Sequence, residues 1–433
     1  MPRAAKNGPV MTTAFKDRVL PTITSEAAIA CIGLYCMAVV MGYGRFLFTA
    51  TLPDIMVQLS LSTTIAGWLA SINYIGYFIG ALIAMFVPQR STWQVLALWS
   101  IISVITTTLL VIPSLSLNSW YVIRLLAGIA SGVAMILSSS FVIQNLSPER
   151  RSVLSAVHYA GIGAGISASA ILTWWLLSLG YHYDIIWLMA GITSLPLLWL
   201  LYAIKPQRPS DLDMLSTHPK QHVSVYQAYM NFKRALYEAI AGHHKALALL
   251  FASYVLAGFG YISSATFLPV MAAQRLTTQT YVGLMIWLVV GLFAMLSNPL
   301  WGALAKRIGE LKTLMGLTVL QAIGMLLPIG FDGAFGLYGN AAILGLTFVG
   351  MVSMTLTLFK NINPAYSNLL IALATLAYAI GQFLGPLVTV ALAGADGNFN
   401  AGLLVAAVGL MIGLVLLVLF RQQSSSVPKP RYG

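Results

Sequence analysis

Three ionisable side chains, Arg45, Arg124 and His158, interrupt long apolar segments of this 433-residue chain. In a membrane, such a charge costs at least about 2.5 kcal/mol unless it meets a partner or a wet cavity, so it points to a functional site. His158 adds a side chain that titrates near neutral pH and could carry a proton. No Asp or Glu lies near the middle of these segments. Buried bases without a buried acid create a positive potential, which favours an anionic ligand.

Arg45 is the best placed of the three to bind such a ligand. It lies eight residues before Pro53, about 12 Å along a helix, and therefore within the apolar segment. The alternative is that Arg45 snorkels toward the nearer membrane interface, and anchoring at the interface is likewise the alternative for Arg124. A single face of one helix is predicted by the 3,4,3,4 spacing of Tyr35, Ala38, Gly42, Arg45 and Thr49.

Composition indicates which elements must position these residues. Hydrophobic residues make up 59% of the chain and charged residues only 8%, whereas roughly 25% of a soluble domain is charged. Twelve apolar runs reach the roughly 20 residues needed to cross a bilayer, six in each half of the chain. We therefore predict an all-α integral membrane protein with twelve transmembrane helices.

The two halves of the chain repeat one pattern. Residues 42–53 read GYGRFLFTATLP and residues 258–269 read GFGYISSATFLP, so that Tyr261 occupies the position of Arg45. Such internal repeats of membrane bundles are typical of secondary transporters. We predict an N-terminal six-helix bundle over 1–204, a cytoplasmic linker with an amphipathic helix over 205–246, and a C-terminal six-helix bundle over 247–433. A pseudo-two-fold axis relates the bundles.

The distribution of basic residues predicts the orientation. All of the 23 Lys and Arg residues except Arg45, Arg124 and Arg275 fall in the tails, the linker and the loops of one side. By the positive-inside rule, we expect both termini in the cytoplasm of a bacterium and the chain in its inner membrane. The net charge of +12 is explained in this way. Because the bases are spread over short loops, no nucleic acid partner is expected.

The fourth span reads RLLAGIASG, with Arg124, Gly128 and Gly132. Together with the six-plus-six repeat and the long middle loop, this segment resembles the major facilitator superfamily. GYGRFLFTATLPDIM and GWLASINYIGYFIGAL are further similar to the YbfB/YjiJ-type bacterial branch. The resemblance covers the whole chain and implies that helices one, four, seven and ten surround a central cavity. For Arg124 it implies a role in proton coupling or folding.

The loop motif that forms a cytoplasmic gate in that superfamily is incomplete here. Ala84 stands where an Asp is expected after span two, and Arg90 is the basic residue that remains. The second copy keeps Arg307 but has Lys306 at the acidic position. We expect Arg90 and Arg307 to take part in gating without the usual carboxylate.

Further polar residues complete the expected site. Asn73 with Tyr77, and Tyr378 with Gln382, are i,i+4 pairs on apolar helices, which hydrogen bonding between helices explains as well as ligand contact does. The proton carrier is expected among His158, Asp54 and Glu26, and the structural alternative for His158 is a hydrogen-bonded core residue. The candidate substrate-binding residues are Arg45, Thr49, Asn73, Tyr77, Arg124, His158, Tyr261, Tyr378 and Gln382.

These observations predict a secondary active transporter that moves a small organic anion of the carboxylate type by alternating access, coupled to protons as symport or antiport. The alternative is efflux of amphipathic drugs or metabolites by proton antiport, which the aromatic residues Tyr74, Tyr77, Trp287 and Tyr378 favour. No H-E-x-x-H, G-x-S-x-G or Cys/His cluster occurs, so we expect no enzyme, catalytic residue, metal or cofactor. The expected partners are the substrate, protons and membrane lipids, and the chain is expected to be a monomer.

Overall fold

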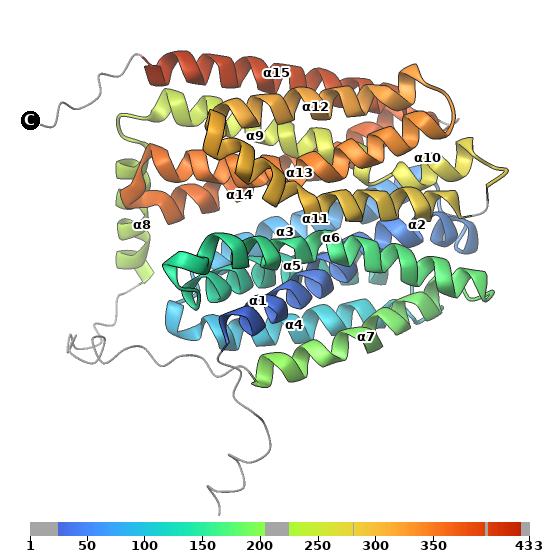
Figure 1. The fold of residues 1–433 in the computed structure, drawn as a ribbon. Helices are drawn as coiled ribbons and strands as arrows, with labels where there is room; N and C mark the ends of the chain where they lie inside the picture. Colours follow the sequence, from blue (N-terminus) through green and yellow to red (C-terminus); the bar gives the residue numbers. More distant parts are fainter. Residues whose placement is uncertain (1–24, 204–224, 280, 395–396, 426–433) are drawn as a thin grey trace, which may run out of the picture.

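The computed structural model describes residues 25–203, 225–279, 281–394 and 397–425, and the regular elements within these ranges are all helices (Figure 1). Twelve of the helical segments in these ranges are long and apolar enough to cross a membrane, which confirms the predicted fold class. The basic N-terminal tail and the opening of the linker, residues 204–224, lie outside the described residues.

The N-terminal half contributes six spans. Three consecutive elements form the first span, and a short 3-10 turn precedes the third. The elements are α1 (Glu26–Met37), η1 (Ala38–Phe46), α2 (Leu47–Gln58), α3 (Thr63–Met85), η2 (Gln89–Ser91), α4 (Thr92–Leu109), α5 (Leu117–Gln144), α6 (Pro148–Ser178) and α7 (Tyr183–Ala203).

The linker and the C-terminal half follow. The described part of the linker contains the helix α8, and the seventh span breaks into two helices at Thr266 and Phe267. The elements are α8 (Val225–Ile240), α9 (His244–Ala265), α10 (Leu268–Arg275), α11 (Val282–Ile308), α12 (Glu310–Gly330), α13 (Ala334–Ile362), η4 (Pro364–Tyr366), α14 (Ser367–Ala393) and α15 (Asn400–Ser425).

Small residues let helices within each half approach closely. A Cβ atom added to Gly128 of α5 would lie 2.0 Å from the backbone oxygen of Asn73 on α3, and one added to Gly132 would lie 2.6 Å from that of Tyr77. Because no side chain fits between these backbones, α3 and α5 pack along their length. The spaced glycines of span four therefore set the packing of the N-terminal half.

The two halves form separate layers that meet along two pairs of helices. Figure 1 shows the N-terminal helices, blue to green, beneath the C-terminal helices, yellow to red. The most extensive contacts between the halves join α6 to α11 and α3 to α14. A Cβ atom at Gly163 would lie 2.5 Å from the backbone oxygen of Gly291, so the first pair is in close contact near its middle.

The two ends of the bundle differ in how the halves are joined. We call the end where α8 lies the linker side, and the end where α2 ends and α7 begins the distal side (Figure 1). On the linker side α8 contacts both halves, because the ring of Phe232 packs 6.1 Å from Phe86 and Glu238 accepts a hydrogen bond from the Tyr366 hydroxyl. On the distal side the halves contact each other directly through Tyr281 and Leu177.

Candidate functional site

Arg45 lies on a π-helix, η1, which interrupts the α-helical first span. The Leu47 N–H donates to the carbonyl of Gly42, five residues back rather than four. π-helical turns are rare and frequent at functional sites. Because each π turn holds more residues than an α turn, 3,4 spacing does not keep residues on one face here. The single face predicted from Tyr35 to Thr49 is therefore wrong.

The two ends of that predicted face point in different directions. The Tyr35 hydroxyl donates to the backbone carbonyl of Thr193 on α7, within the N-terminal half. Arg45 turns toward the C-terminal half, where it contacts Gln382 of α14. Thr49 is buried in α2, and the contacts of Arg45 do not involve it.

Arg45 is held by a hydrogen-bonded chain that crosses between the halves. Its Nη2 donates to Oε1 of Gln382 at 3.1 Å, and Nε2 of Gln382 lies 2.8 Å from the hydroxyl of Tyr261, to which it donates. All three residues are buried, with Arg45 only 3% exposed. The guanidinium therefore does not snorkel to an interface.

Aromatic rings surround the guanidinium. Its Cζ lies 4.3 Å from the ring centroid of Tyr77, 4.9 Å from that of Tyr74 and 5.5 Å from that of Phe46. Each contact is within the range of a cation–π interaction, which contributes about 2 kcal/mol when desolvated. These rings fix the plane of the guanidinium and shield it from water.

A stack of four rings continues from this site along the C-terminal half. Tyr254 stacks on Tyr378 with centroids 4.6 Å apart, Tyr378 on Tyr261 at 5.7 Å, and Tyr261 on Phe348 at 5.3 Å. Gly258 allows this approach, since a Cβ atom there would lie 2.4 Å from the backbone oxygen of Tyr378. The stack is rigid because each ring is buried between its neighbours.

No carboxylate neutralises Arg45 among the described residues. Within them, the close contacts between a basic side chain and a carboxylate join His182 to Asp54 and Arg234 to Glu238, and neither involves Arg45. The Nε of Arg45 is buried without a hydrogen-bond partner. The site thus combines a positive charge, one free N–H donor and an aromatic wall.

Arg124 occupies a different place, inside the N-terminal half. Its Nε donates to the Leu69 carbonyl at 3.3 Å, and its Cζ lies 4.3 Å from the ring centroid of Phe48. Asn73 donates from Nδ2 to the Arg124 carbonyl at 2.9 Å. Arg124 is 2% exposed, so its side chain does not reach an interface. These hydrogen bonds of Arg124 and Asn73 thus join α3 to α5 and do not include the cluster of Arg45, Gln382 and Tyr261.

His158 is also separate from the cluster. It is fully buried, and its Nε2 lies 3.2 Å from the Ser139 hydroxyl on α5. Its Nδ1 has no hydrogen-bond partner and faces α1, where a Cβ atom at Gly33 would lie 2.5 Å away. This position is in the half of the bundle toward the linker side, because α5 ends and α6 begins there.

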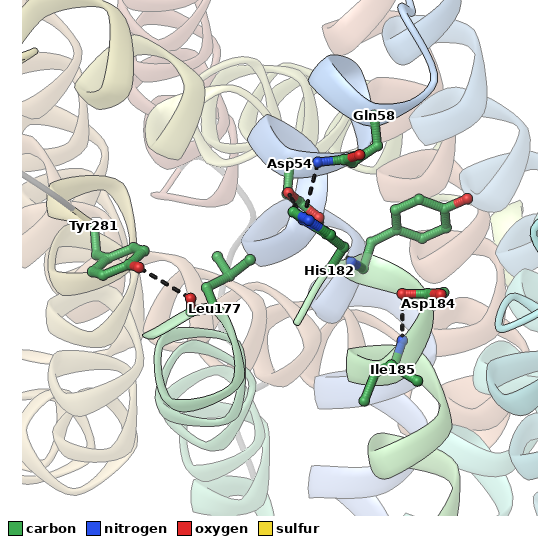
Figure 2. A network of polar contacts seen from close by, with 8 residues as sticks. Asp54, Gln58, Leu177, His182, Asp184, Ile185 and Tyr281 are labelled. Carbon is green, nitrogen blue, oxygen red and sulfur yellow. Dashed lines mark hydrogen bonds and ion pairs between the residues drawn. The ribbon is translucent and has the colours of Figure 1, made fainter. Parts of the chain in front are cut away.

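The two carboxylates predicted as proton carriers lie at opposite ends of the first span. Asp54 accepts the Tyr183 N–H at 2.7 Å and lies 3.2 Å from Nδ1 of His182, so it caps the start of α7 (Figure 2). At the other end, Glu26 accepts a hydrogen bond of 3.1 Å from the Ser147 hydroxyl. Both contacts join elements of the N-terminal half.

The predicted gating residues lie on the linker side. Arg90 in η2 and Arg307 near the end of α11 are both exposed. Neither is paired with a carboxylate in the part of the chain that the structure describes. This lack of an acidic partner among the described residues agrees with the absence of the expected acid from the loop motif.

The structure brings together Arg45, Tyr77, Tyr261, Tyr378 and Gln382 of the predicted site. Sequence reasoning missed Phe46 and Phe348, which carry no signal that separates them from core phenylalanines. Tyr74 and Trp287 were singled out only for the alternative function. Phe46 directly follows Arg45 in the chain, and this adjacency was the one available sign.

Comparison with solved structures agrees with the two-bundle fold. The crystal structure of the POT family transporter PepTSo aligns with a TM-score of 0.71 at 13% identity, covering 94% of this chain and all of that one (100%). The nucleoside transporter NupG aligns with a TM-score of 0.69 at 14% identity, covering 92% of this chain and 99% of that one. At these identities the likeness concerns the fold.

Sequence comparison identifies the family. The chain is 25% identical over 351 residues to "Uncharacterized MFS-type transporter YceJ" of Bacillus subtilis (strain 168), which covers 80% of this chain and 84% of that protein. Residues 37–418 match the family described as "Uncharacterised MFS-type transporter YbfB". This chain therefore belongs to the YbfB-type family of major facilitator superfamily transporters, as a multi-pass bacterial membrane protein.

Proposed function

We propose that this protein is a secondary active carrier that moves a small organic anion across the bacterial inner membrane by alternating access. The observation that carries the proposal is the Arg45 guanidinium, which is buried at the contact between the halves without a carboxylate partner among the described residues. An isolated buried charge is unfavourable. A substrate carboxylate would supply the counter-charge that the protein does not.

The geometry of Arg45 suits this role. The Nε–H is free to donate while Nη2 is held by Gln382, so an arriving carboxylate has a donor ready without first breaking the link between the halves. Because Arg45 belongs to one half and Gln382 to the other, a bound anion would contact both halves. Substrate binding would therefore be coupled to the rocking motion of the two halves.

The linker side faces the cytoplasm, because the basic loops gather there, and Arg90 and Arg307 take part in the gate on that side. His158 carries the proton, since its Nδ1 is unpartnered and the carboxylates of Asp54 and Glu26 are engaged at helix ends. Labelling from outside intact cells should reach a cysteine placed near Asp184 and not one placed in α8.

A second candidate function is efflux of amphipathic aromatic compounds. The four-ring stack of Tyr254, Tyr378, Tyr261 and Phe348 favours it. A cationic or neutral aromatic ligand would bind this stack without needing Arg45. The two candidates therefore differ in how they respond to loss of the Arg45 charge.

The test compares Arg45→Lys and Arg45→Gln. A charge-assisted, bidentate contact contributes about 1.5 to 3 kcal/mol, or roughly ten- to a hundred-fold in affinity. Lys keeps the charge but loses the planar fork, so Arg45→Lys should retain part of the binding and Arg45→Gln almost none. Folded yield of Arg45→Gln should equal that of the parent, since an unpaired buried charge has been removed.

The probes are acetate, phenylacetate, succinate and citrate, each paired with its neutral amide. Binding is measured on purified protein by calorimetry, and flux in liposomes. The proposal requires that at least one acid binds more tightly than its amide and that Arg45→Gln abolishes this difference. A folded Arg45→Gln protein that binds every acid as tightly as the parent does would exclude the anion carrier and favour efflux of aromatic compounds.

A further inference from the structure

A narrow apolar pocket lies beside Arg45 and is not explained by an anion site alone. Its walls include Phe46, Ile166, Trp287, Val290, Leu344 and Phe348. Tyr261 belongs both to this pocket and to the hydrogen-bonded chain of Arg45, and the Phe46 ring lies 5.5 Å from the guanidinium carbon. The charged site and the pocket thus share two walls.

The pocket is built from both halves. Phe46 comes from the first span, and its ring centroid lies 6.1 Å from that of Trp287 on α11 and 6.5 Å from that of Phe348 on α13. These rings hold the halves together through apolar contacts. A ligand placed among them would contact both halves, as a carboxylate on Arg45 would.

The chemistry of the walls restricts what can bind there. The Tyr261 hydroxyl already accepts from Gln382, and the remaining walls offer hydrocarbon and aromatic rings. One polar atom is unused, because the indole Nε1 of Trp287 is buried without a hydrogen-bond partner. A second carboxylate in this pocket would have no cation to pair with among these walls, and burying it would be unfavourable.

The size of the pocket restricts the ligand further. The side chains of these walls are packed so closely in this conformation that not even a water molecule fits between them. Its side chains must separate to admit even a small group. A small apolar body, such as one six-membered ring or a short alkyl chain, requires the least separation of these side chains.

Building on the proposed anion site, we propose that the substrate is a monocarboxylate with a single small apolar body. Its carboxylate binds Arg45, and its body lies among Phe46, Trp287 and Phe348. Acids with two or three carboxylates are poor substrates, because the pocket has no cation to pair with a second carboxylate. The amphipathic shape of the ligand follows from the juxtaposition of one buried cation with one apolar pocket.

The first arm of the test ranks acids on the unmodified protein. Each methylene buried in an apolar pocket contributes about ten- to two-hundred-fold to discrimination. Phenylacetate and hexanoate should therefore bind at least about tenfold more tightly than acetate, and succinate and citrate should bind no better than acetate. Affinity is measured by calorimetry on the purified chain.

The second arm alters the pocket and leaves Arg45 in place. Trp287→Ala should weaken phenylacetate binding at least about tenfold more than it weakens acetate binding. Trp199→Ala is the matched control, since Trp199 is 53% exposed on α7 and away from the pocket. If Trp287→Ala does not fold, Ala265→Leu fills the same pocket from the wall of α9. It should likewise weaken phenylacetate binding more than acetate binding.

The outcomes separate this inference from the proposed function. If succinate or citrate binds most tightly and depends on Arg45, the anion carrier stands and the apolar monocarboxylate is excluded. The inference is also overturned if Ala265→Leu leaves phenylacetate affinity intact. If no acid binds better than its amide, both the carrier of anions and this substrate class fail.

Discussion

The hydroxyl of Tyr281 donates a hydrogen bond of 3.1 Å to the backbone carbonyl of Leu177, joining the start of α11 to the end of α6 on the distal side (Figure 2). Tyr281 has a φ of 60°, a left-handed conformation that costs energy for a bulky residue. The strained backbone places the ring across the boundary between the halves. Opening of the distal side must break this bond.

Tyr281→Phe should therefore favour opening of the distal side. A neutral hydrogen bond contributes about 1 kcal/mol, so the open population should rise about fivefold. Spin-label distances across the distal ends of α6 and α11 measure this population. Tyr181→Phe is the control, since Tyr181 is 48% exposed on the same side. An unchanged distance distribution for Tyr281→Phe would show that the bond does not hold the halves together.

Two buried glutamines of the C-terminal half allow a matched comparison. Gln382 bonds Arg45 and Tyr261, whereas Gln321 of α12 is fully buried with neither amide atom hydrogen-bonded. Gln382→Leu should leave the Arg45 cation without its polar partner and lower both thermal stability and acid binding. Gln321→Leu should raise the free energy of unfolding by roughly 1 to 3 kcal/mol, because it removes buried polar atoms that have no hydrogen-bond partner.

Thermal unfolding and phenylacetate affinity of both glutamine variants are measured side by side. Gln321→Leu should bind as the parent does, since the Gln321 amide is hydrogen-bonded to no residue of the Arg45 cluster. Equal losses of affinity in the two variants would mean that Gln382 acts only through general packing.

The fold was predictable because it rests on a one-dimensional property, the length of apolar runs. A bilayer leaves no alternative to helices for such runs, and the internal repeat placed Tyr261 at the position of Arg45. The structure then joins these two residues through Gln382. The repeat marked the two positions as equivalent, and the family resemblance implied that the helices carrying them surround one cavity.

The rest of the site depends on rotation about helix axes, which spacing alone did not determine. The π-helix in the first span forms where Gly42 packs against Gly165 and Gly44 against Ser103, and such tertiary contacts leave no periodic signal in the sequence. Arg124 was expected among the substrate-binding residues because it is a base within an apolar span. Its guanidinium instead contacts Leu69 and Phe48 inside its own half, a direction that the apolar pattern does not encode.

The contact of α8 with the C-terminal half should depend on pH. The Glu238 carboxyl accepts a hydrogen bond from the Tyr366 hydroxyl and lies 2.8 Å from Nε of Arg234. The Tyr366 hydrogen bond, and to a lesser extent the Arg234 contact, lower the pKa of this carboxyl below its ordinary value. A carboxyl with a depressed pKa adds stability above its ordinary pKa and loses it as the pH falls through the lowered pKa. Asn363, which donates to the backbone carbonyls of Glu238 and Ala239, does not titrate.

Amide hydrogen exchange of residues 234–240 measures this contact. Protection, the slowing of exchange relative to an unstructured amide at the same pH, should be high at neutral pH and lower once Glu238 is protonated. Glu238→Gln should show at neutral pH the low protection that the parent shows in acid, and its protection should not depend on pH. A Glu238→Gln protein whose α8 still loosens on acidification would assign the effect to another group.

Proton coupling should depend on His158. The ring is fully buried, with Nε2 on Ser139 and Nδ1 unpartnered toward α1, so a proton can reach it only when α1, α5 and α6 move apart. Alternating access provides such a movement on the linker side. His158→Gln keeps a polar group near Ser139 but cannot be protonated near neutral pH.

We expect His158→Gln to uncouple uptake from an imposed pH gradient and to retain exchange of phenylacetate across liposome membranes. His182→Gln is the control, because His182 is exposed on the distal side and pairs with Asp54. Uptake by His182→Gln should still follow the gradient. If His158→Gln liposomes respond to the pH gradient as the parent does, the proton must travel with Asp54, Glu26 or the substrate. Loss of exchange together with loss of coupling would instead place His158 in substrate binding, although it lies apart from Arg45 in this structure.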